Sequence, residues 1–515
     1  MALVTGAILM KSLETCEIGG SEIATAALKW AMRVRTLFVV ALVAAASGPV
    51  RADWKSLANL EREGAQVSAA AIDLSTGSPI PGLHADTRLT PASLTKLITA
   101  AATLQEWPAD KMFRTTLLAA GTVHSGVLAG DLILHSAGDP SLDDHSLWTL
   151  AAQLKGFDIS SVAGGLTISL APFGAIACGT KDRCDAQHLS DRAYNAPIAA
   201  LGVDFGNWCV LVRPTQVGSD AQVRGCGVAH LPIRMTGTVK TAASGSRQTL
   251  WVERETGVDG DSLRVGGNIP IGADQRVWRA MSNSAMGVGL LLMETLREMG
   301  ISVTGEITVT QQPPPESARE LASTEGLTLR EQLGRMLRFS NNYIADVLTM
   351  DLASSTAATP PSDLTAAAQV LTQFMSRVPR GVQISDRQPL VLMSGSGLTV
   401  ENRLSASDLT AVLAYQYRNT GHFPAFYGGL TVPREAPFEF MRNGTDAWLD
   451  RVALKTGTLN DPVSVCGVAG YIRKHDGGWI AFAVIVNGSS ARNHIPLDVS
   501  MHAIQSDLEE VLARQ

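Results

Sequence analysis

The sequence lacks a strong charge of either sign. Its 515 residues carry a formal net charge of −6, and charged residues make up only 17% of the chain. Aromatic residues are also scarce, at 5%, and no basic run is interleaved with them. Because such a patch is absent, there is no electrostatic basis for binding nucleic acid. Hydrophobic residues make up 45%, which is typical of a globular chain long enough for more than one domain.

Several catalytic signatures are missing as well. No serine lies in a Gly-x-Ser-x-Gly elbow, which argues against a classical esterase. The ten histidines are scattered and none lies in an H-E-x-x-H arrangement, which argues against a zinc peptidase. We therefore expect neither a metal nor another cofactor.

Long hydrophobic runs are absent from the body of the chain. No segment after the N-terminal region reaches 18 apolar residues, so we expect no membrane span in the mature chain. A shorter apolar run, Leu37–Ala46, follows Arg33 and Arg35 and ends in small residues. This order is typical of a secretory signal peptide. We expect translation to start at Met32, residues 1–52 to be an N-terminal extension plus signal peptide, and the protein to be exported.

Cysteine is rare, but four of the six cysteines fall within one stretch of 49 residues: Cys178, Cys184, Cys209 and Cys226. Export makes disulfides possible, and four cysteines allow three pairings. We favour Cys178–Cys184 with Cys209–Cys226. A zinc site is the rival interpretation, although no C-x-x-C spacing or histidine pair supports it.

Lysine is scarce too, since the 42 basic residues divide into 10 lysines and 32 arginines. Of these lysines only Lys96 has a serine, Ser93, three residues before it. Arginine would serve equally well on a surface, but it cannot lose its proton, whereas a lysine in suitable surroundings can. The two residues lie where an apolar helical pattern begins, so we expect them to share one face. They are candidates for a nucleophile and its base.

Two further stretches carry polar residues in unexpected places. "FSNNYIAD" places Ser340 and Asn342 in an apolar helical setting, where serine and asparagine are poor helix formers. "LKTGTL" places Lys455, Thr456 and Gly457 in a strand pattern, where glycine often marks close backbone approach. Taken alone, each stretch is as well explained by a cap, a turn or a solvated charge.

Together and in this order, S-x-x-K, S-x-N and K-T-G are the signature set of penicillin-binding proteins and serine β-lactamases. The sequence resembles the class-C low-molecular-mass penicillin-binding proteins, which are D-alanyl-D-alanine carboxypeptidases and endopeptidases. The resemblance covers nearly all of the chain after the signal, including "GDLILHSAGDPSL", "YNAPIAALGVDF" and "SGSGLTVENRLS". It implies peptidoglycan peptides as substrates, β-lactam antibiotics as acylating inhibitors, and a periplasmic location.

The order of the predicted elements indicates an α+β fold. Strand patterns at both chain ends with helices between them suggest an antiparallel sheet with flanking helices, of the transpeptidase/β-lactamase type. The long segment between the first two motifs would be a large β-rich insertion of one or two smaller domains. We expect a catalytic domain of residues 53–110 and 311–515, an inserted domain II of 111–205 and 281–310, and an inserted β-rich domain III of 206–280.

The resemblance also implies catalytic roles. Ser93 would be the acylated nucleophile, Lys96 its base, and Ser340 the relay of the proton to the leaving amine. To act as base, Lys96 needs a pKa about 3 units below its usual value, a cost of about 4 kcal/mol. Burial beside a second cation, Lys455, can supply such a shift. The main-chain N–H groups of Ser93 and Thr458 would form the oxyanion hole.

Substrate binding would fall to the remaining motif residues. Asn342 would hold the substrate's peptide group, Lys455 and Thr456 would meet its terminal carboxylate, and Gly457 would leave room for its backbone. The chain departs from the family pattern at two positions, because Ser394 and, by our alignment, Ser169 stand where relatives usually carry aspartate.

Two alternatives stay open. A serine β-lactamase would use the same motifs, but it would not need the large insertion. It would also need an arrangement that deacylates quickly, and the sequence shows none. A non-catalytic penicillin-recognising scaffold of the cell wall would keep the fold without the chemistry, and the three intact motifs argue against it.

Overall fold

The structure is a computed structural model that describes residues 53–176, 178, 180–272, 274–357, 359–380 and 388–514. These residues belong to one compact unit, 52–515. No helix within the described part is long and apolar enough to cross a membrane. The predicted N-terminal extension and signal peptide lie outside the described residues.

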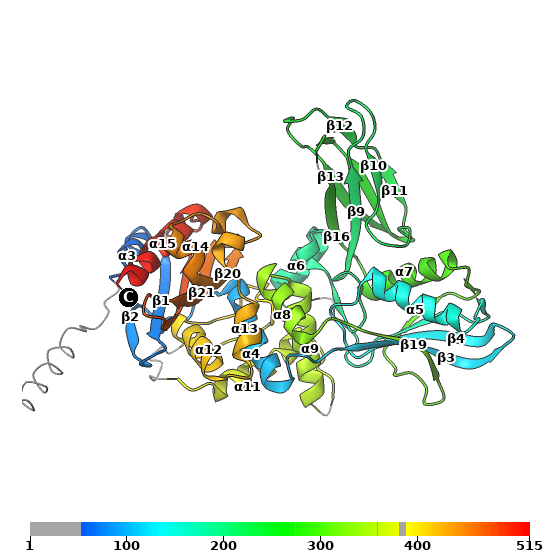
Figure 1. Ribbon diagram of the computed structural model, residues 1–515, viewed down its shortest axis with the longest axis horizontal. Helices are drawn as coiled ribbons and strands as arrows, with labels where there is room; N and C mark the ends of the chain where they lie inside the picture. Colours follow the sequence, from blue (N-terminus) through cyan, green and yellow to red (C-terminus); the bar gives the residue numbers. More distant parts are fainter. Residues whose placement is uncertain are drawn as a thin grey trace, which may run out of the picture. The chain divides into compact units, whose positions relative to one another are not determined.

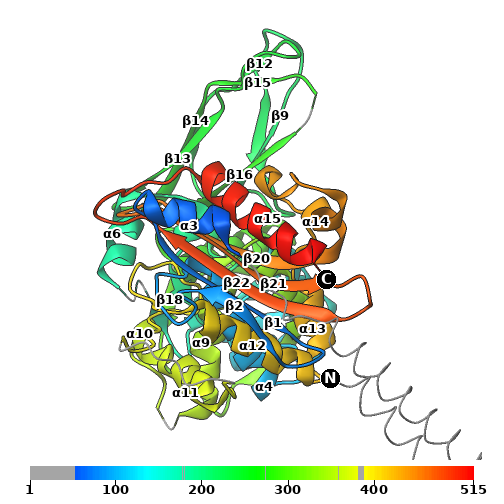
Figure 2. The ribbon, with the colours of Figure 1, turned by 90° about the vertical axis from the view of Figure 1, so that its left-hand side faces the viewer.

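An antiparallel sheet of five strands joins the two ends of the chain (Figure 2). Its order is β2-β1-β22-β21-β20, and the strands are β1 (Gln66–Asp73), β2 (Pro79–Leu83), β20 (Val452–Leu459), β21 (Val465–Arg473) and β22 (Trp479–Asn487). Strand β1 pairs with β22 along its full length, from Gln66 opposite Asn487 to Asp73 opposite Ile480. The predicted α+β fold, with its sheet built from both chain ends, is confirmed.

Helices cover both faces of this sheet, which explains why β21 and β22 are continuous apolar runs. Helices α3 (Lys55–Arg62) and α15 (Leu497–Ala513) pack against each other over one face (Figure 2). Helix α12 (Ala406–Arg418) packs on β1 and β22 and, with α4 (Thr95–Glu106), covers the other face (Figure 1).

Helix α4 is the centre of the helical layer. It is contacted by α12 and by α8 (Leu329–Arg338), α9 (Asn342–Thr356), α11 (Gln369–Arg377) and α13 (Phe423–Gly428). Ten of its twelve residues are buried in consequence, Lys96 among them. A lysine at such a position needs a specific reason, because burying a charged amine is costly.

The inserted region contains a seven-stranded sheet. It consists of β3 (Arg114–His124), β4 (Val127–Ser136), β5 (Ser161–Val162), β6 (Leu166–Ser169), β17 (Ser302–Val303), β18 (Ile307–Thr310) and β19 (Arg319–Glu325). Helices α5 (Asp144–Gly156) and α7 (Ser284–Glu298) pack on each other and on this sheet. Because β19 pairs with β3, the sheet takes a strand from beyond residue 310. The predicted domain boundaries themselves stay a prediction.

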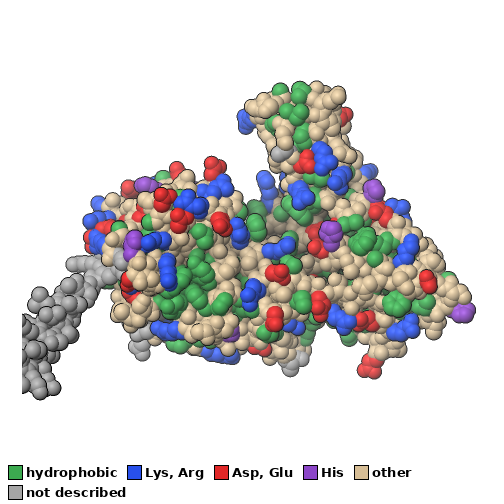
Figure 3. All heavy atoms as spheres, viewed as in Figure 1, with side chains coloured by type: hydrophobic (Ala, Val, Ile, Leu, Met, Phe, Trp, Pro, Cys, Tyr) green, Lys and Arg blue, Asp and Glu red, His purple; other side chains and the backbone are tan. Residues whose placement is uncertain are grey.

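The segment between the two parts of this region folds into short strands, as its glycine-rich turns suggest. They are β9 (Asn207–Arg213), β10 (Gln222–Gly225), β11 (Met235–Gly237), β12 (Lys240–Ala242), β13 (Trp251–Gly257), β14 (Gly260–Gly266), β15 (Asn268–Pro270) and β16 (Gln275–Ala280). Figure 3 shows acidic and basic side chains interspersed over the visible face.

Both favoured disulfides are confirmed. Cys178 is bonded to Cys184, and Cys209 to Cys226. The first bridge lies at the start of α6 (Lys181–Leu189), and the second ties β9 to the end of β10. Cys466 is a free thiol buried in β21.

Candidate active site

A cavity of about 870 Å³ lies where the predicted motifs meet the inserted region. Four predicted site residues line it: Ser93, Ser340, Asn342 and Thr458. On the inserted side, α6 contributes Asp182 and Arg183, and the short 3-10 turn η2 (Ala193–Asn195) contributes Tyr194. The first two motifs and Thr458, which directly follows the third, are therefore brought to one cavity, although the motifs are more than 100 residues apart in sequence.

Ser93 lies in a 3-10 turn, η1 (Ala92–Leu94), directly before α4. Ala92 has a φ of 48°, in the left-handed region, which costs a non-glycine residue about 1–2 kcal/mol. Gly397 packs so closely that a Cβ there would lie 1.9 Å from the Ala92 carbonyl oxygen. The turn that presents the Ser93 hydroxyl is thus strained and held from outside, as is common where geometry serves function.

Lys96 is fully buried and its Nζ has three polar neighbours. Ser93 Oγ lies at 2.9 Å, Asn342 Oδ1 at 2.6 Å and the Ser396 carbonyl oxygen at 2.7 Å. Two of these, the amide oxygen and the carbonyl, can only accept. A neutral amine has two N–H groups and one lone pair, so it can donate to both and leave the lone pair for the Ser93 hydroxyl.

The second motif is a turn followed by a helix start. Ser340 has a φ of 56°, and Asn341 caps α9 by accepting a hydrogen bond from the Ile344 N–H at 3.0 Å. We expected Ser340 inside a helical segment, but it precedes the helix. The poor helix propensity of serine is therefore no obstacle at this position. Asn342, the first residue of α9, also donates from Nδ2 to the Tyr194 carbonyl at 3.2 Å.

The third motif forms part of β20. Lys455 is 1% exposed and donates to Ser340 Oγ at 2.9 Å and to the Thr456 carbonyl at 2.5 Å. Thr456 is buried beside it. A Cβ on Gly457 would lie 2.6 Å from the Pro91 carbonyl oxygen and 3.1 Å from the Ser93 nitrogen. The nearest neighbour of this glycine is therefore the chain's own nucleophile turn, which β20 touches backbone to backbone.

Burial lowers the pKa of both lysines. The pKa of Lys96 lies well below its usual value because of desolvation first and the charge of Lys455 second, with Arg183 acting in the same direction and Asp346 in the opposite one. Desolvation lowers the pKa of Lys455 to about 7. The pKa of Lys96 is thus shifted in the direction that the sequence prediction requires of it.

Sequence reasoning missed the residues that support the motifs. Asp346 lies one helical turn after Asn342, and its Oδ1 accepts from the Ser396 N–H at 2.8 Å. Its Oδ2 forms a buried ion pair with Arg183. An aspartate in the apolar helical stretch "FSNNYIAD" is a signal in the sequence for a buried, paired carboxylate. The pairing of Arg183 with this aspartate depends on tertiary structure.

The two serines that depart from the family pattern, Ser394 and Ser169, are both buried and hydrogen-bonded to the backbone. Ser394 is buried, and its Oγ accepts from the Gly397 N–H at 3.0 Å, which closes the turn that presses on Ala92. Ser169 is buried in β6 and donates to the Gln312 carbonyl at 2.8 Å.

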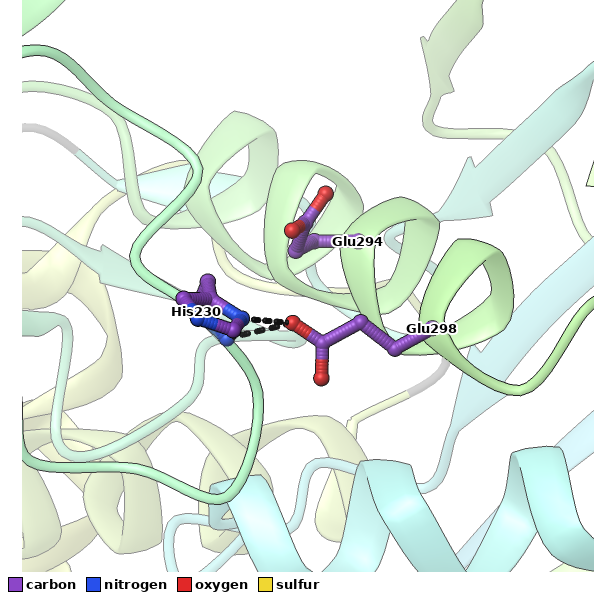
Figure 4. A group of neighbouring side chains, drawn as sticks. All are labelled: His230, Glu294 and Glu298. Carbon is purple, nitrogen blue, oxygen red and sulfur yellow. Dashed lines mark hydrogen bonds and ion pairs between the residues drawn. The ribbon is translucent and has the colours of Figure 1, made fainter.

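A group of possible metal ligands lies away from this cavity. His230, Glu294 and Glu298 bring their ligand atoms within 4.8 Å of one another (Figure 4). Glu298 pairs with His230, while Glu294 is bound in a bidentate fashion by Arg297. The His230 side chain is 86% exposed. These ion pairs account for the cluster, so the described residues offer no built metal site here.

The chain is similar in sequence to a family of known proteins. The model of the family described as D-Ala-D-Ala carboxypeptidase 3 (S13) matches residues 52–507. The chain is 29% identical over 452 residues to a D-alanyl-D-alanine carboxypeptidase of Actinomadura sp., covering 83% of this chain and 79% of that one. It is 26% identical over 451 residues to the D-alanyl-D-alanine carboxypeptidase DacB of Haemophilus influenzae, covering 83% and 86%.

Solved structures share the fold. The crystal structure of penicillin binding protein 4 (dacB) from Haemophilus influenzae superposes with a TM-score of 0.69 at 21% identity, covering 88% of this chain and 99% of that one. The same protein complexed with a β-lactam gives a TM-score of 0.65 at 20% identity, with 89% and 99% covered.

Proposed function

The chain belongs to the D-Ala-D-Ala carboxypeptidase 3 (S13) family and is a serine-type D-alanyl-D-alanine carboxypeptidase, and on this premise we propose how its residues perform the reaction. The observation that carries the proposal is the 2.9 Å contact between Lys96 Nζ and Ser93 Oγ, made by an amine whose other two polar neighbours can only accept. Because burial and the charge of Lys455 lower the pKa of Lys96, this contact supports a neutral amine that takes the hydroxyl proton.

In the acylation step, Lys96 removes the proton of Ser93 as Oγ attacks the carbonyl carbon of the penultimate D-alanine. The negative charge that develops on the carbonyl oxygen is stabilised by the main-chain N–H groups of Ser93 and Thr458. One such donor is typically worth about 3–4 kcal/mol of the barrier. The contact of Gly457 with the η1 turn supports this role, because it keeps the two backbones close.

The C–N bond to the terminal D-alanine then breaks, and the leaving amine needs a proton. Ser340, whose hydroxyl lies 2.9 Å from Lys455 Nζ and lines the cavity, relays this proton. It gives its own hydroxyl proton to the amine and is reprotonated by the proton that Lys96 took from Ser93, so that Lys96 becomes neutral again. Water next attacks the acyl-serine ester, releases the shortened peptide and restores the Ser93 hydroxyl. Lys96 serves as the base for this water as well.

Recognition of the substrate's terminal carboxylate falls to Lys455 and Thr456, and that of its peptide group to Asn342. Desolvation alone brings the pKa of Lys455 to about 7. A substrate carboxylate next to the amine would favour its charged form. Substrate binding therefore protonates Lys455 and pairs the two charges in the same step.

We assign peptidoglycan stem peptides as the substrates and β-lactam antibiotics as acylating inhibitors, with endopeptidase cleavage of D-alanyl cross-links as a second activity. A protein that acts on the cell wall must leave the cytoplasm, which agrees with the secretory signal predicted before residue 53 and with the two disulfides. In a cell with two membranes this means the periplasm.

The test is to incubate the purified protein with uncross-linked and cross-linked muropeptides and to weigh the products. Loss of one terminal D-alanine is the expected product of carboxypeptidase action, and separation of dimers into monomers that of endopeptidase action. A Ser93→Ala variant should lose both activities. If it releases D-alanine at the wild-type rate, the acyl-serine mechanism is wrong.

Penicillin turnover separates this function from a serine β-lactamase. A carboxypeptidase should react with about one equivalent of penicillin in a burst and then turn over slowly. Rapid steady hydrolysis would favour the β-lactamase alternative.

A further inference from the structure

Helix α6 of the inserted region reaches into the catalytic machinery. Its N-terminal turn is tied by the Cys178–Cys184 disulfide. Asp182 accepts hydrogen bonds from Thr399 Oγ1 at 3.1 Å and from the Val400 N–H at 2.9 Å. The helix is thus fastened to the loop that follows Ser396, whose carbonyl receives a hydrogen bond from the base.

The residue after Asp182 is Arg183, and its side chain is only 1% exposed. Its Nη1 forms a buried ion pair with Asp346, which is itself fully buried. Among the described residues, no hydrogen-bond acceptor is found for the Nε and Nη2 atoms of Arg183. The contact with Asp346 is therefore the one that offsets the cost of burying this guanidinium.

Asp346 also acts on the base. Its Oδ1 accepts from the Ser396 N–H, and the carbonyl of the same residue accepts from Lys96 Nζ. The backbone of Ser396 is thus held at its N–H by Asp346 and at its carbonyl by Lys96. Among the described residues, the charges acting on Lys96 are Lys455 from β20, Asp346 from α9 and Arg183 from α6.

We propose that Arg183 is a positioning residue through which the inserted region controls the catalytic base: it balances the charge of the Asp346 carboxylate, which acts on Lys96, and it fixes Asp346 where that residue holds the backbone of Ser396, whose carbonyl anchors the amine. This inference rests on the proposed function, since it assigns a role relative to Lys96 as base. Without the guanidinium, an uncompensated carboxylate faces Lys96 and stabilises its protonated form. A protonated Lys96 cannot accept the Ser93 proton.

The test measures the rate of acylation by a fluorescent penicillin from about pH 5 to about pH 9.5, where the rising limb reports loss of the proton from the base. Arg183→Gln should move this limb upward by about one pH unit, so that acylation falls several-fold near neutral pH and recovers at alkaline pH. Arg183→Lys keeps a cation and should restore most of the wild-type profile.

Substitution of Asp346, the ion-pair partner of Arg183, should shift the rising limb of the pH profile in the opposite direction. Asp346→Asn removes the carboxylate but keeps an oxygen for the Ser396 N–H, so it should move the limb downward. The double variant Arg183→Gln with Asp346→Asn leaves no charge at either position, and its limb should return toward that of the wild type. A matched control is Lys181→Gln, which removes an exposed cation from the same helix and should leave the profile unchanged.

Two results would overturn the inference. One is an Arg183→Gln profile whose midpoint is that of the wild type, with rates lowered equally at every pH, since that is what a purely structural role predicts. The other, which applies even if Arg183→Gln fails to fold, is an Asp346→Asn limb that does not move or moves upward. A wild-type protein that no penicillin labels would instead refute the proposed function.

Discussion

Asn342 Oδ1 lies 2.6 Å from Lys96 Nζ, while Nδ2 of the same side chain donates to the Tyr194 carbonyl at 3.2 Å. One amide therefore connects the base in α4 to a turn of the inserted region. The oxygen can only accept, so it orients an N–H of Lys96 away from Ser93. Lys96 is thus oriented by its surroundings, which also lower its pKa, and both effects depend on segments distant in sequence.

The first prediction concerns the need for a base that can lose its proton. Lys96→Arg retains a cation at the same place, but a guanidinium keeps its proton at every pH relevant to proteins. We expect D-alanine release and penicillin acylation to fall by about 10²- to 10⁴-fold, the usual contribution of a general base. Stopped-flow acylation with a fluorescent penicillin measures this.

The same substitution at a lysine outside the site is the control. Lys155→Arg, at the end of α5, should leave acylation unchanged, because Lys155 is exposed and its Nζ donates to the Met299 carbonyl at the surface. A Lys96→Arg variant with a wild-type acylation rate would exclude Lys96 as the base.

The second prediction concerns the contact between β20 and the nucleophile turn. Gly457→Ala would place a methyl group 2.6 Å from the Pro91 carbonyl oxygen, so β20 and η1 must move apart. The N–H groups of Ser93 and Thr458 would then no longer converge on one oxygen. We expect acylation to fall by about 10²- to 10³-fold, as when an oxyanion donor is lost. We also expect a loss of stability, measured by urea unfolding.

Gly334→Ala in α8 is the matched control, because a Cβ there meets nothing within 4 Å. Replacing a helical glycine by alanine should stabilise the protein by about 0.5–1 kcal/mol and leave acylation unchanged. Equal kinetics for the two alanine variants would show that the tight contact at Gly457 is irrelevant to catalysis.

Much of this site follows from local sequence patterns. Ser93 and Lys96 are three residues apart at a helix start, and Lys455 and Gly457 lie in a recognisable strand. No single motif suffices to predict its role, but the three in this order resemble one family, and that resemblance gives the site residues. The sheet built from both chain ends follows from the order of strands and helices. Four clustered cysteines in an exported chain indicate disulfides, but they allow three pairings, and the structure shows that the favoured one is present.

The remaining features depend on contacts between distant segments. Nothing near Arg183 in the sequence predicts that it pairs with Asp346, 163 residues away. The positive φ of Ser340 arises because Asn341, and not Ser340, caps α9, a choice between adjacent polar residues that propensity does not resolve. The tight packing of Gly457 on η1 likewise depends on tertiary structure. The sequence pattern predicts a close backbone approach at this glycine but not which segment approaches it.

The third prediction concerns Asp139, which is buried in the inserted region. Burial raises its pKa to about 6 from an ordinary 3.8, although Ser141 donates to its Oδ1 from both N–H and Oγ. The folded state therefore binds more protons than the unfolded state between about pH 4 and pH 6, so stability falls as pH rises through that window. Above it the full cost of the charged form is present.

Asp139→Asn removes this charge and keeps an oxygen for Ser141. We expect it to stabilise the protein at pH 7 by up to about 3 kcal/mol and to change little near pH 3, as measured by urea unfolding at both pH values. Asp110→Asn, at an exposed carboxylate, is the control and should have no effect at either pH. A destabilised Asp139→Asn variant at pH 7 would mean that the charged carboxylate is stabilising.

The fourth prediction separates the stability cost of burying the Lys455 amine from the contribution of this amine to substrate binding. Desolvation lowers its pKa to about 7, so between pH 7 and about 10.5 the unfolded state binds more protons than the folded state. Stability therefore rises with pH through that window, and the whole cost is present below it. Lys455→Met should stabilise the protein at pH 6 by about 2–5 kcal/mol, less the hydrogen bonds lost to Ser340 and Thr456, and the gain should vanish near pH 10.5.

Activity should change in the opposite direction. Without the cation for the substrate carboxylate, kcat/KM for D-alanine release should fall by about 10- to 100-fold, the value of one hydrogen bond to a charged group. Lys474→Met is the contrasting control, since Lys474 is ion-paired with Asp73 and Asp476, which raise its pKa. Its loss should destabilise the protein at neutral pH and leave kcat/KM unchanged. If Lys455→Met instead destabilises the fold at pH 6, then Lys455 stabilises the folded site. The interpretation of Lys455 as a binding residue that costs the protein stability would then be wrong.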